Sequence, residues 1–236
     1  MRLVDRSLSS FRWSAGWLVM FVLGAAASTL PGQERADDGG EKPAEVSLFD
    51  GQSLGDWKPT KFGGEGEVEV IDGQLVLHPG SPLTGVTWSG EAPSGEYELT
   101  LEAKKTRGID FFCGLTFPVG DEHCSLIVGG WAGSLVGLSC LDGNDAAHND
   151  TKRYLTFEKD RWYRIKVRVT EQAIAAWIDD EQVIDQPRGN IEFSVRGEVL
   201  LSRPLGLCTF ETEGVYRNLT WRPIAGDSDD ESHSDR

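Results

Sequence analysis

The sequence predicts an all-β domain, a sandwich or jelly roll of two antiparallel sheets. Short runs of alternating apolar and polar residues recur at roughly 8–12-residue spacing, with Gly, Pro and Asp between them. The 28 glycines suit tight turns between strands. No stretch of ten or more residues has a convincing helical period. These observations together favour many short strands in two layers.

The expected strands follow one another along the chain with few long gaps. The clearest is 162–169, in which Tyr163, Ile165, Val167 and Val169 would face inward. Asp72 and Gly73 predict a tight hairpin turn of the kind that needs positive φ. In chain order, we expect strands at 68–71, 74–78, 96–103, two within 108–131, then 134–141, 162–169, 172–178, 182–185, 205–209 and 215–221.

The first thirty residues have the order of an export signal. Three arginines precede an apolar run from Trp17 to Ala27, which ends in small residues. This run is shorter than the roughly 20 residues that span a bilayer. A generous count over 14–30 leaves an uncleaved membrane anchor as the alternative. We therefore expect a secreted or periplasmic protein, bound to a membrane only if the segment is uncleaved.

The remaining chain divides by composition. Residues 31–46 are rich in Gly, Pro and charge and predict a linker. Residues 47–224 would form the folded domain, and 225–236 an acidic, disordered tail. The formal net charge of −15 argues against a nucleic-acid partner, since phosphate binding needs clustered Lys and Arg. The sequence makes no prediction of oligomeric state.

Residues 108–131 hold the densest mixture of ionisable, thiol and aromatic side chains. Period-two alternation puts Asp110, Phe112 and Thr116 on one face of the first strand, opposite an apolar face that includes Phe111 and Cys113. An acid and an aromatic ring on one face are what a sugar-sized ligand needs. A solvated sheet face is the alternative.

The four cysteines are Cys113, Cys124, Cys140 and Cys208. They contain no CxxC pair, which disfavours a structural zinc site. Export permits disulfides, and four cysteines allow three connectivities. Cys113 and Cys124 lie on consecutive expected strands and could face each other. The alternative is that the cysteines are small buried apolar residues.

Several motifs, in order, resemble one known family. They are 47–51 (SLFDG) with Leu54 and Trp57, 70–75 (VIDGQL), 161–163 (RWY), 176–183 (AWIDDEQV) and 215–219 (VYRNL). The chain resembles the 3-keto-disaccharide hydrolase domain family, also described as 3-keto-glucoside lyase and 2-hydroxy-glucal hydratase. The resemblance implies a concanavalin-A-like lectin/glucanase jelly roll. It also implies an exported, carbohydrate-active domain that cleaves the glycosidic bond of 3-keto-glycosides.

The match is poorest where chemistry is expected. Family members commonly carry an Asn-Ser-Gly-Ile segment and then a strand with a glutamate. Here 106–109 reads TRGI, so only Gly108 and Ile109 match, and the glutamate of the following strand could be Glu122 in a shifted register. This departure favours the alternative from another class, a non-catalytic lectin-like module for carbohydrate binding or adhesion.

The implied elimination needs a general base and an acid. His123 is the best candidate base, because its ordinary pKa near 6.5 suits proton transfer at neutral pH. Asp110 and Glu122 are alternates, and either could hold a divalent cation together with His123. Phe112 and Trp131 could be platforms for a sugar ring. The alternative is that His123 lies at a polar turn and that the aromatic rings belong to the core.

Two more residues complete the predicted ligand-binding set. Ser125 follows His123 on the same expected strand, and Asn144 belongs to an oxygen-rich cluster, 142–150. That cluster could bind calcium, although a solvated turn is the default for such residues. The sequence does not specify a metal. It also lacks a nucleophile elbow, a phosphate loop and a dinucleotide fingerprint, and the alternating glutamates of 65–69 resemble a solvated strand more than a glycosidase pair.

Overall fold

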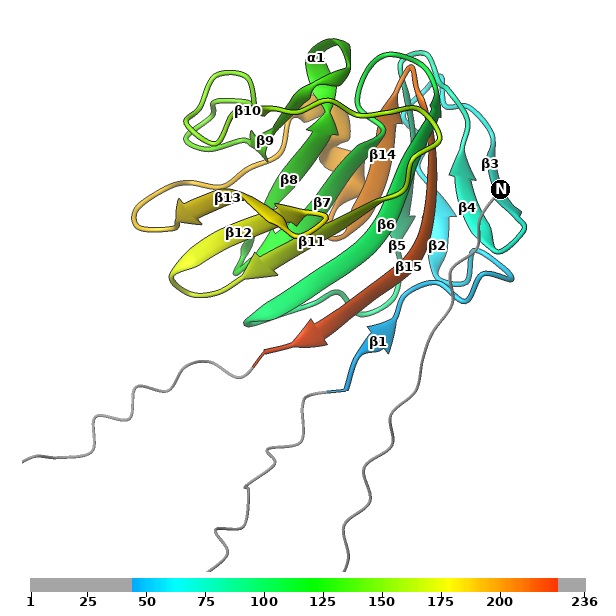
Figure 1. The fold of residues 1–236 in the computed structure, drawn as a ribbon. Coiled ribbons are helices and arrows are strands. Elements are labelled where there is room, and N and C mark those ends of the chain that lie inside the picture. Colours follow the sequence, from blue (N-terminus) through cyan, green and yellow to red (C-terminus); the bar gives the residue numbers. More distant parts are fainter. Residues whose placement is uncertain (1–43, 225–236) are drawn as a thin grey trace, which may run out of the picture. The chain divides into compact units, whose positions relative to one another are not determined.

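A computed structural model describes residues 44–224, and they form two antiparallel sheets packed face to face (Figure 1). The all-β sandwich predicted from the sequence is therefore confirmed. The export signal, most of the linker and the acidic tail lie outside the described residues. Within 44–224, no helix is long and apolar enough to cross a membrane.

The first sheet has eight strands, and every neighbouring pair is antiparallel. β1 (Val46–Ser47) pairs with β15 (Glu213–Pro223) and lies outside the linear order of the other seven strands. The others follow in the spatial order β13 (Glu181–Pro187), β12 (Ala173–Ile178), β11 (Tyr163–Val169), β6 (Tyr97–Arg107), β15 (Glu213–Pro223), β4 (Gln74–Leu77) and β3 (Val68–Ile71).

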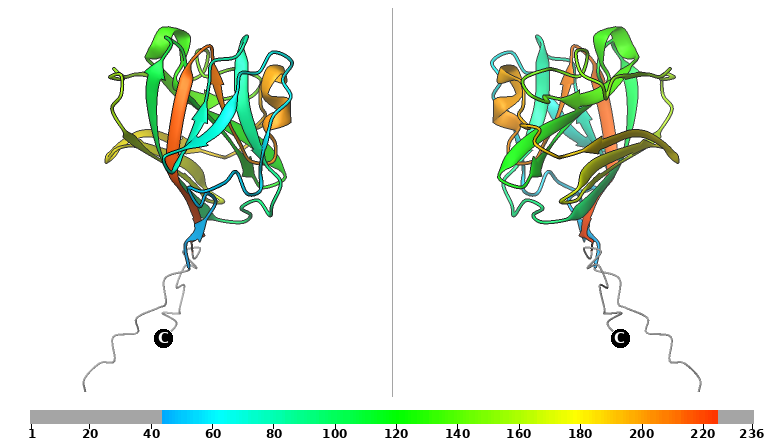
Figure 2. Two further views of the ribbon diagram at one scale, coloured as in Figure 1. Left: turned by 90° about the vertical axis from the view of Figure 1, so that its right-hand side faces the viewer. Right: turned by 90° about the vertical axis from the view of Figure 1, so that its left-hand side faces the viewer.

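The second sheet has seven strands and is also antiparallel. Its spatial order is β10 (Arg153–Tyr154), β9 (Leu135–Ser139), β8 (Glu122–Gly129), β7 (Cys113–Val119), β14 (Gly206–Phe210), β5 (Leu83–Trp88) and β2 (Trp57–Pro59). Two short elements flank it, the turn α1 (Gly130–Gly133) and the 3₁₀ helix η1 (Gly197–Ser202). η1 packs against β5 and β14 (Figure 2).

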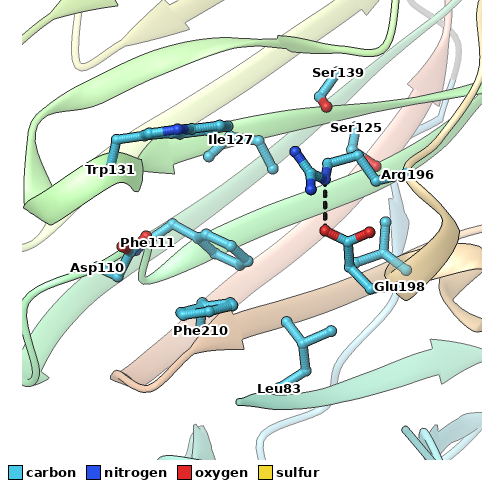
Figure 3. Close-up of a pocket in the computed structure, with 11 residues that line it drawn as sticks. Leu83, Asp110, Phe111, Ser125, Ile127, Trp131, Ser139, Arg196, Glu198 and Phe210 are labelled. Carbon is cyan, nitrogen blue, oxygen red and sulfur yellow. Dashed lines mark hydrogen bonds and ion pairs between the residues drawn. The ribbon is translucent and has the colours of Figure 1, made fainter. Parts of the chain in front are cut away.

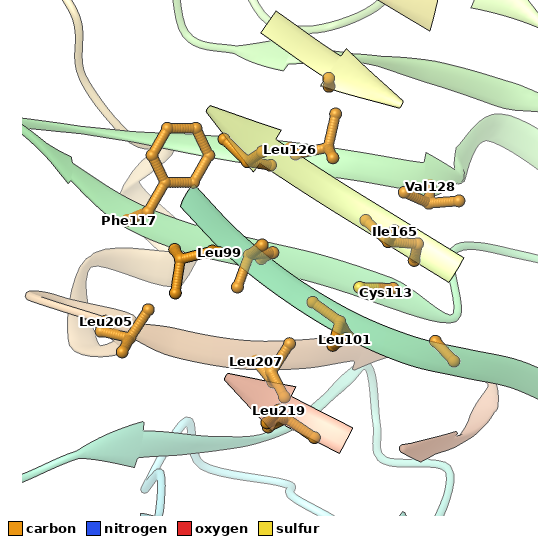
Figure 4. Packing of buried hydrophobic residues seen from close by; sticks show 14 of the residues in the cluster. Leu99, Leu101, Cys113, Phe117, Leu126, Val128, Ile165, Leu205, Leu207 and Leu219 are labelled. Atoms are coloured by element: carbon orange, nitrogen blue, oxygen red, sulfur yellow. The ribbon is translucent and has the colours of Figure 1, made fainter. Parts of the chain in front are cut away.

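The main core lies between the sheets (Figure 4). Leu99 and Leu101 from β6 meet Leu126 and Val128 from β8, and all four are at most 3% exposed. The predicted inward residues of β11 are buried, and its basic residues lie on the opposite face. Period-two alternation therefore holds across the sandwich, and it decides which side of each strand is left for function.

The hairpin predicted at Asp72 and Gly73 is present between β3 and β4. Asp72 has φ 50° and Gly73 has φ 77°, as a two-residue turn with two left-handed positions requires. The sequence analysis missed β5, whose run LTGVTW contains a glycine. Gly85 is needed there because a Cβ would lie 2.5 Å from the carbonyl oxygen of Leu207 on the paired strand.

The first strand of the 108–131 region begins later than predicted. β7 starts at Cys113, and the residues before it form a loop. Gly108 has φ 95°, which takes the chain out of β6, and Asp110 accepts a hydrogen bond from the backbone N–H of Phe111 at 2.7 Å. Such a local side-chain bond competes with strand pairing. Alternation therefore cannot be extended back to Asp110.

All four cysteines are buried free thiols. Burial raises the pKa of Cys124 and of Cys208 to about 12 and that of Cys113 further. Cys113 and Cys124 do not face each other, because Cys113 pairs with Val128 and Cys124 with Phe117. The arrangement is that of small apolar core residues.

Candidate functional site

A small pocket lies on the face of the second sheet that points away from the core (Figure 3). β8 explains this placement: Cys124, Leu126 and Val128 enter the core, so Ser125 and Ile127 point to the other side. The pocket has a volume of about 220 Å³. We call it the aromatic pocket; its lining is Leu83, Asp110, Phe111, Ser125, Ile127, Trp131, Ser139, Arg196, Glu198, Val199 and Phe210.

One side of the aromatic pocket is apolar. The rings of Phe111 and Phe210 have centroids 5.9 Å apart and form a continuous wall. Leu83 of β5 and Val199 of η1 extend this apolar wall at the contact between the two elements. Aromatic and aliphatic surface of this kind packs against the C–H faces of a ring-shaped ligand and excludes water.

Trp131 forms the rim, with 40% of its surface exposed. It lies in α1, where Trp131 and Ala132 have φ 47° and 66°, a strained conformation for residues other than glycine. Asp110 holds this turn, since its Oδ2 accepts a hydrogen bond from the backbone N–H of Ala132 at 3.3 Å. Gly133 is required beside it, because it has φ 98° and a Cβ there would lie 2.9 Å from the carbonyl oxygen of Ile109.

Opposite the aromatic wall lies an ion pair. The Nε of Arg196 donates to the Oε1 of Glu198 (Figure 3). Arg196 is held from behind by Asp145, with 2.6 Å between Nη1 and Oδ2. The other carboxylate oxygen of Glu198 accepts no hydrogen bond from residues 44–224. The pocket thus places a carboxylate with one free oxygen and a fixed guanidinium across from an apolar surface.

Asp145 is itself strongly held. Burial raises its pKa, but hydrogen bonds from His148 and the backbone of Ala147 outweigh that effect, so the pKa lies below its ordinary value. An ionised Asp145 keeps Arg196 in place. The floor of the pocket is lined by Ser125 and Ser139, which are 2% and 1% exposed.

The structure brings three of the predicted site residues together. Asp110, Ser125 and Trp131 all line the aromatic pocket. Asp110 is committed to backbone partners, because its two oxygens accept from Phe111 and Ala132. Its place in the structure is therefore that of a support for the Trp131 turn.

Phe112 is a correction to the sequence analysis. It is 0% exposed and packs in the core against Phe157 and Tyr163, with centroids 5.2 and 6.1 Å away. Because the loop before β7 does not alternate, its neighbour Phe111 faces the pocket instead. Phe112 is inaccessible as a platform for a sugar.

His123 and Glu122 lie at the opposite end of the β7–β8 pair from Asp110. His123 pairs with Pro118, whereas Asp110 precedes Cys113, which pairs with Val128. At roughly 3.3 Å per residue, this separates the two groups well beyond contact. The predicted convergence of Asp110 with His123, for acid–base work or for a shared cation, is therefore wrong.

Glu122 and His123, the first two residues of β8, have neighbours other than the aromatic pocket. Burial first and nearby Arg203 second lower the pKa of His123. Glu122 accepts a hydrogen bond from the backbone N–H of Phe193 at 3.1 Å, which anchors the segment that leads to η1. Neither side chain lines the aromatic pocket.

Asn144 lies in the 142–150 turn, outside the aromatic pocket. Two of the carboxylates considered for calcium have protein partners: Asp142 accepts from the backbone of Glu192, and Asp145 binds Arg196 and His148. Within 44–224, no group of three or more His, Cys, Asp or Glu residues is arranged to hold a metal.

Sequence reasoning missed Phe111, Glu198, Val199 and Phe210 as pocket residues, and no motif or spacing singles out Arg196. The segment 197–202 has no strand periodicity, so nothing local ties Glu198 to a site. One signal that the sequence offers and that was not used is glycine: Gly129, Gly130 and Gly133 surround Trp131, and such density marks backbone that needs unusual conformations.

A β-sandwich with an aromatic-walled pocket that is polar on its far side has the features that a sugar ring needs, as in carbohydrate-active and lectin-like domains. The family model described as the 3-keto-alpha-glucoside-1,2-lyase-like domain matches residues 44–222. The chain belongs to that family, as its motifs predicted. No curated protein matches the sequence significantly.

Solved structures share the fold at low identity. A Bacillus subtilis protein with a galectin-like fold aligns with TM-score 0.54 and 11% identity, over 76% of this chain and 94% of that one. The Emp47p carbohydrate recognition domain aligns with TM-score 0.52 and 11% identity, over 78% and 99%. A structure reported with endo-acting O-glycanases of the human gut microbiota gives TM-score 0.50 and 13% identity, over 78% and 100%. At these identities the likeness supports the fold alone.

Proposed function

We propose that this chain is an exported enzyme that cleaves the glycosidic bond of 3-keto-glycosides by elimination, with the aromatic pocket as its active site. Family membership supports the substrate class. The observation that carries the proposal is the pairing of Glu198, which has one free carboxylate oxygen, with Arg196 opposite an aromatic wall. The pocket volume of about 220 Å³ fits one sugar ring better than a long glycan.

The chemistry follows from the ketone. A carbonyl at C3 acidifies the proton at C2, so a base can remove that proton and leave an enolate. The C3 carbonyl then re-forms, the electron pair makes the C1–C2 double bond, the bond from C1 to the glycosidic oxygen breaks, and the leaving oxygen takes up the proton that the base removed. Water can add across the resulting double bond, which completes a net hydrolysis.

The pocket residues divide these roles. Glu198 takes the C2 proton on its free oxygen, in the manner of a general base. Arg196, fixed by Asp145, lies where its positive charge stabilises the oxygen that becomes an enolate. Phe111, Phe210 and the Trp131 rim hold the ring and exclude water. No step requires His123.

Turnover of an aryl 3-keto-glucoside, measured as release of the aryl alcohol, tests this assignment. We expect Glu198→Gln to lower kcat by roughly 10²–10⁴-fold, the usual contribution of a general base. Glu192→Gln is the matched control, because Glu192 is an exposed glutamate on the same segment outside the pocket.

Two results would contradict the proposal. Full activity of Glu198→Gln would remove Glu198 from the mechanism. No turnover by the native chain, together with retained binding of the keto-glucoside, would instead support a non-catalytic carbohydrate-binding module. The two functions are therefore separable with one substrate and one variant.

A further inference from the structure

The turn α1, at the rim of the aromatic pocket, holds two consecutive residues other than glycine in the left-handed region. Trp131 has φ 47° and ψ 68°, and Ala132 has φ 66° and ψ 29°. This conformation is disfavoured for both, because Cβ comes close to the following carbonyl oxygen, and most of all for a bulky residue. Within 44–224, the other non-glycine residues with positive φ stand singly; they are Asp72, Asp142, Asp160, Asp179, Glu211 and Asn218.

Few bonds hold the turn in this conformation. The backbone N–H of Ala132 donates to the Oδ2 of Asp110 at 3.3 Å, and the backbone N–H of Ser134 donates to the carbonyl oxygen of Gly130 at 3.2 Å. The indole N–H of Trp131 has no acceptor among residues 44–224. A strained backbone persists only where its surroundings over-determine it. Asp110 is therefore the side-chain latch of this turn.

Glycines bound the strained pair on both sides. Gly129 has φ 80° and Gly133 has φ 98°. Glycine adopts left-handed and right-handed backbone about equally well, so these positions can absorb a change of φ and ψ. The strands beyond them are fixed, because Gly130 bridges to Leu135 and β8 pairs with β9. Only the tip of the turn is free to change conformation; we call it the Trp131 lid, residues 131–133.

The latch also connects the Trp131 lid to the wall of the aromatic pocket. The Oδ1 of Asp110 accepts from the backbone N–H of Phe111 at 2.7 Å, and its Oδ2 accepts from Ala132 on the lid. Trp131, Asp110 and Phe111 lie along the same side of the pocket (Figure 3). A ring seated against Phe111 and Phe210 therefore has Trp131 beside it only while the lid is latched to Asp110.

We propose that the Trp131 lid opens and closes the aromatic pocket. In the closed form, the strained backbone is held by Asp110 and Trp131 completes the rim. In the open form, the bond between Asp110 and Ala132 is broken and the backbone relaxes. A bound sugar ring favours the closed form, because only that form offers it the Trp131 ring. The inference rests on the proposed function for its ligand; Asp110 is a positioning residue and takes no part in bond breaking.

Fluorine NMR of the chain labelled with 5-fluorotryptophan tests the lid. The Trp131 signal is assigned by its absence in Trp131→Phe. Relaxation dispersion of that signal reports exchange between two conformations on the microsecond-to-millisecond timescale, which is usual for lids. We expect such exchange in the ligand-free chain, and we expect saturating methyl 3-keto-glucoside to suppress it.

Two variants should move the ratio of open to closed form in opposite directions. Asp110→Asn keeps one acceptor oxygen for two N–H groups, so it should raise the ratio about tenfold, close to the loss of one hydrogen bond to a charged group. Ala132→Gly should lower the ratio roughly threefold, because glycine adopts φ 66° without strain. Asp121→Asn is the matched control, an exposed aspartate in the β7–β8 turn outside the pocket.

The outcomes separate the lid from the chemistry. A Trp131 signal without exchange in the ligand-free chain would overturn the lid. Shifts of the same sign in Asp110→Asn and Ala132→Gly would overturn it as well, since general damage to the turn acts in one direction. Exchange that bound methyl 3-keto-glucoside leaves unchanged would overturn the coupling to ligand. If the native chain neither binds nor cleaves that compound, the proposed function fails, and the ligand-free spectra still decide whether the latch exists.

Discussion

Phe111 and Phe112 are neighbours in sequence and lie on opposite sides of the second sheet. Phe112 is fully buried between the sheets with Phe157 and Tyr163, whereas Phe111 stacks near Phe210 in the aromatic pocket. One phenylalanine ring therefore belongs to the core, and the ring of the next residue belongs to the proposed binding wall. Replacement of Phe112 should therefore mainly lower stability, and replacement of Phe111 should mainly weaken ligand binding.

We expect Phe112→Ala to lower the free energy of unfolding by roughly 3–5 kcal/mol, the range for removal of a buried phenylalanine ring. Phe111→Ala, at a partly exposed position, should cost less than about 2 kcal/mol but weaken binding of a 3-keto-glucoside. Urea denaturation followed by tryptophan fluorescence measures both free energies. Equal losses of stability would contradict the separation of core and pocket.

Residue-level prediction from sequence succeeded where an element is regular and failed where it is not. The inward residues of β11 follow from alternation alone. Asp110 and Trp131 were recognised as site residues because ionisable, thiol and aromatic side chains are dense in residues 108–131. Phe112 was misplaced because a local hydrogen bond of Asp110 ends the alternation, and Glu198 was missed because only tertiary packing of η1 brings it to the pocket.

At the scale of elements, a histidine between two carboxylates adds a side-chain link between the β3–β4 hairpin and β15, the strand that pairs with β4. The Nε2 of His78 lies 2.7 Å from Glu69 on β3, and its Nδ1 lies 2.8 Å from Glu213 on β15. Glu213 also accepts from Thr106 and Arg107 of β6. Three strands thus meet at this cluster.

The protonation of His78 should make this attachment depend on pH. Burial lowers its pKa, but the hydrogen bonds with Glu69 and Glu213 outweigh burial, so its pKa is raised above the ordinary 6.5. A raised pKa in the folded state means that the charged form is favoured by folding. Its contribution to stability is complete below about pH 6.5 and is lost as the pH rises through the raised pKa.

We therefore expect the free energy of unfolding to fall between about pH 6 and pH 9 in the native chain, and to fall less in His78→Gln. Denaturant titrations at the two pH values measure the difference. Glu67→Gln is the control, since Glu67 lines the same surface but its side chain makes no hydrogen bond to His78. An equal fall in the native chain and in His78→Gln would show that the imidazole does not contribute.

At the scale of the whole molecule, the two-sheet architecture was predictable and the site was only partly so. Strand positions follow from local patterns, and the family motifs lie largely in strands and turns that build the sandwich. The aromatic pocket combines β5, β8, β9, β14, α1 and η1, and no local pattern states which of these elements meet. Sequence therefore located Asp110, Ser125 and Trp131, and the fold supplied the aromatic wall and the pair of Arg196 and Glu198.

The sandwich also isolates its thiols from solvent. All four cysteines are at most 6% exposed, although only Cys113 and Cys124 lie in the main core between the sheets. A thiol reacts through its thiolate, and burial raises the pKa values of Cys113, Cys124 and Cys208. Reaction of the cysteines should therefore require opening of the sandwich.

We expect a disulfide reagent at about pH 8 to label none of the four thiols in the native chain and all four in concentrated urea, because only the unfolded chain exposes them as thiolates. Counting the labelled cysteines by mass spectrometry measures this. Two missing labels in urea would contradict free thiols. The pair to examine would then be Cys124 and Cys140, since pairing of Ser125 with Ser139 places these two opposite each other on β8 and at the end of β9.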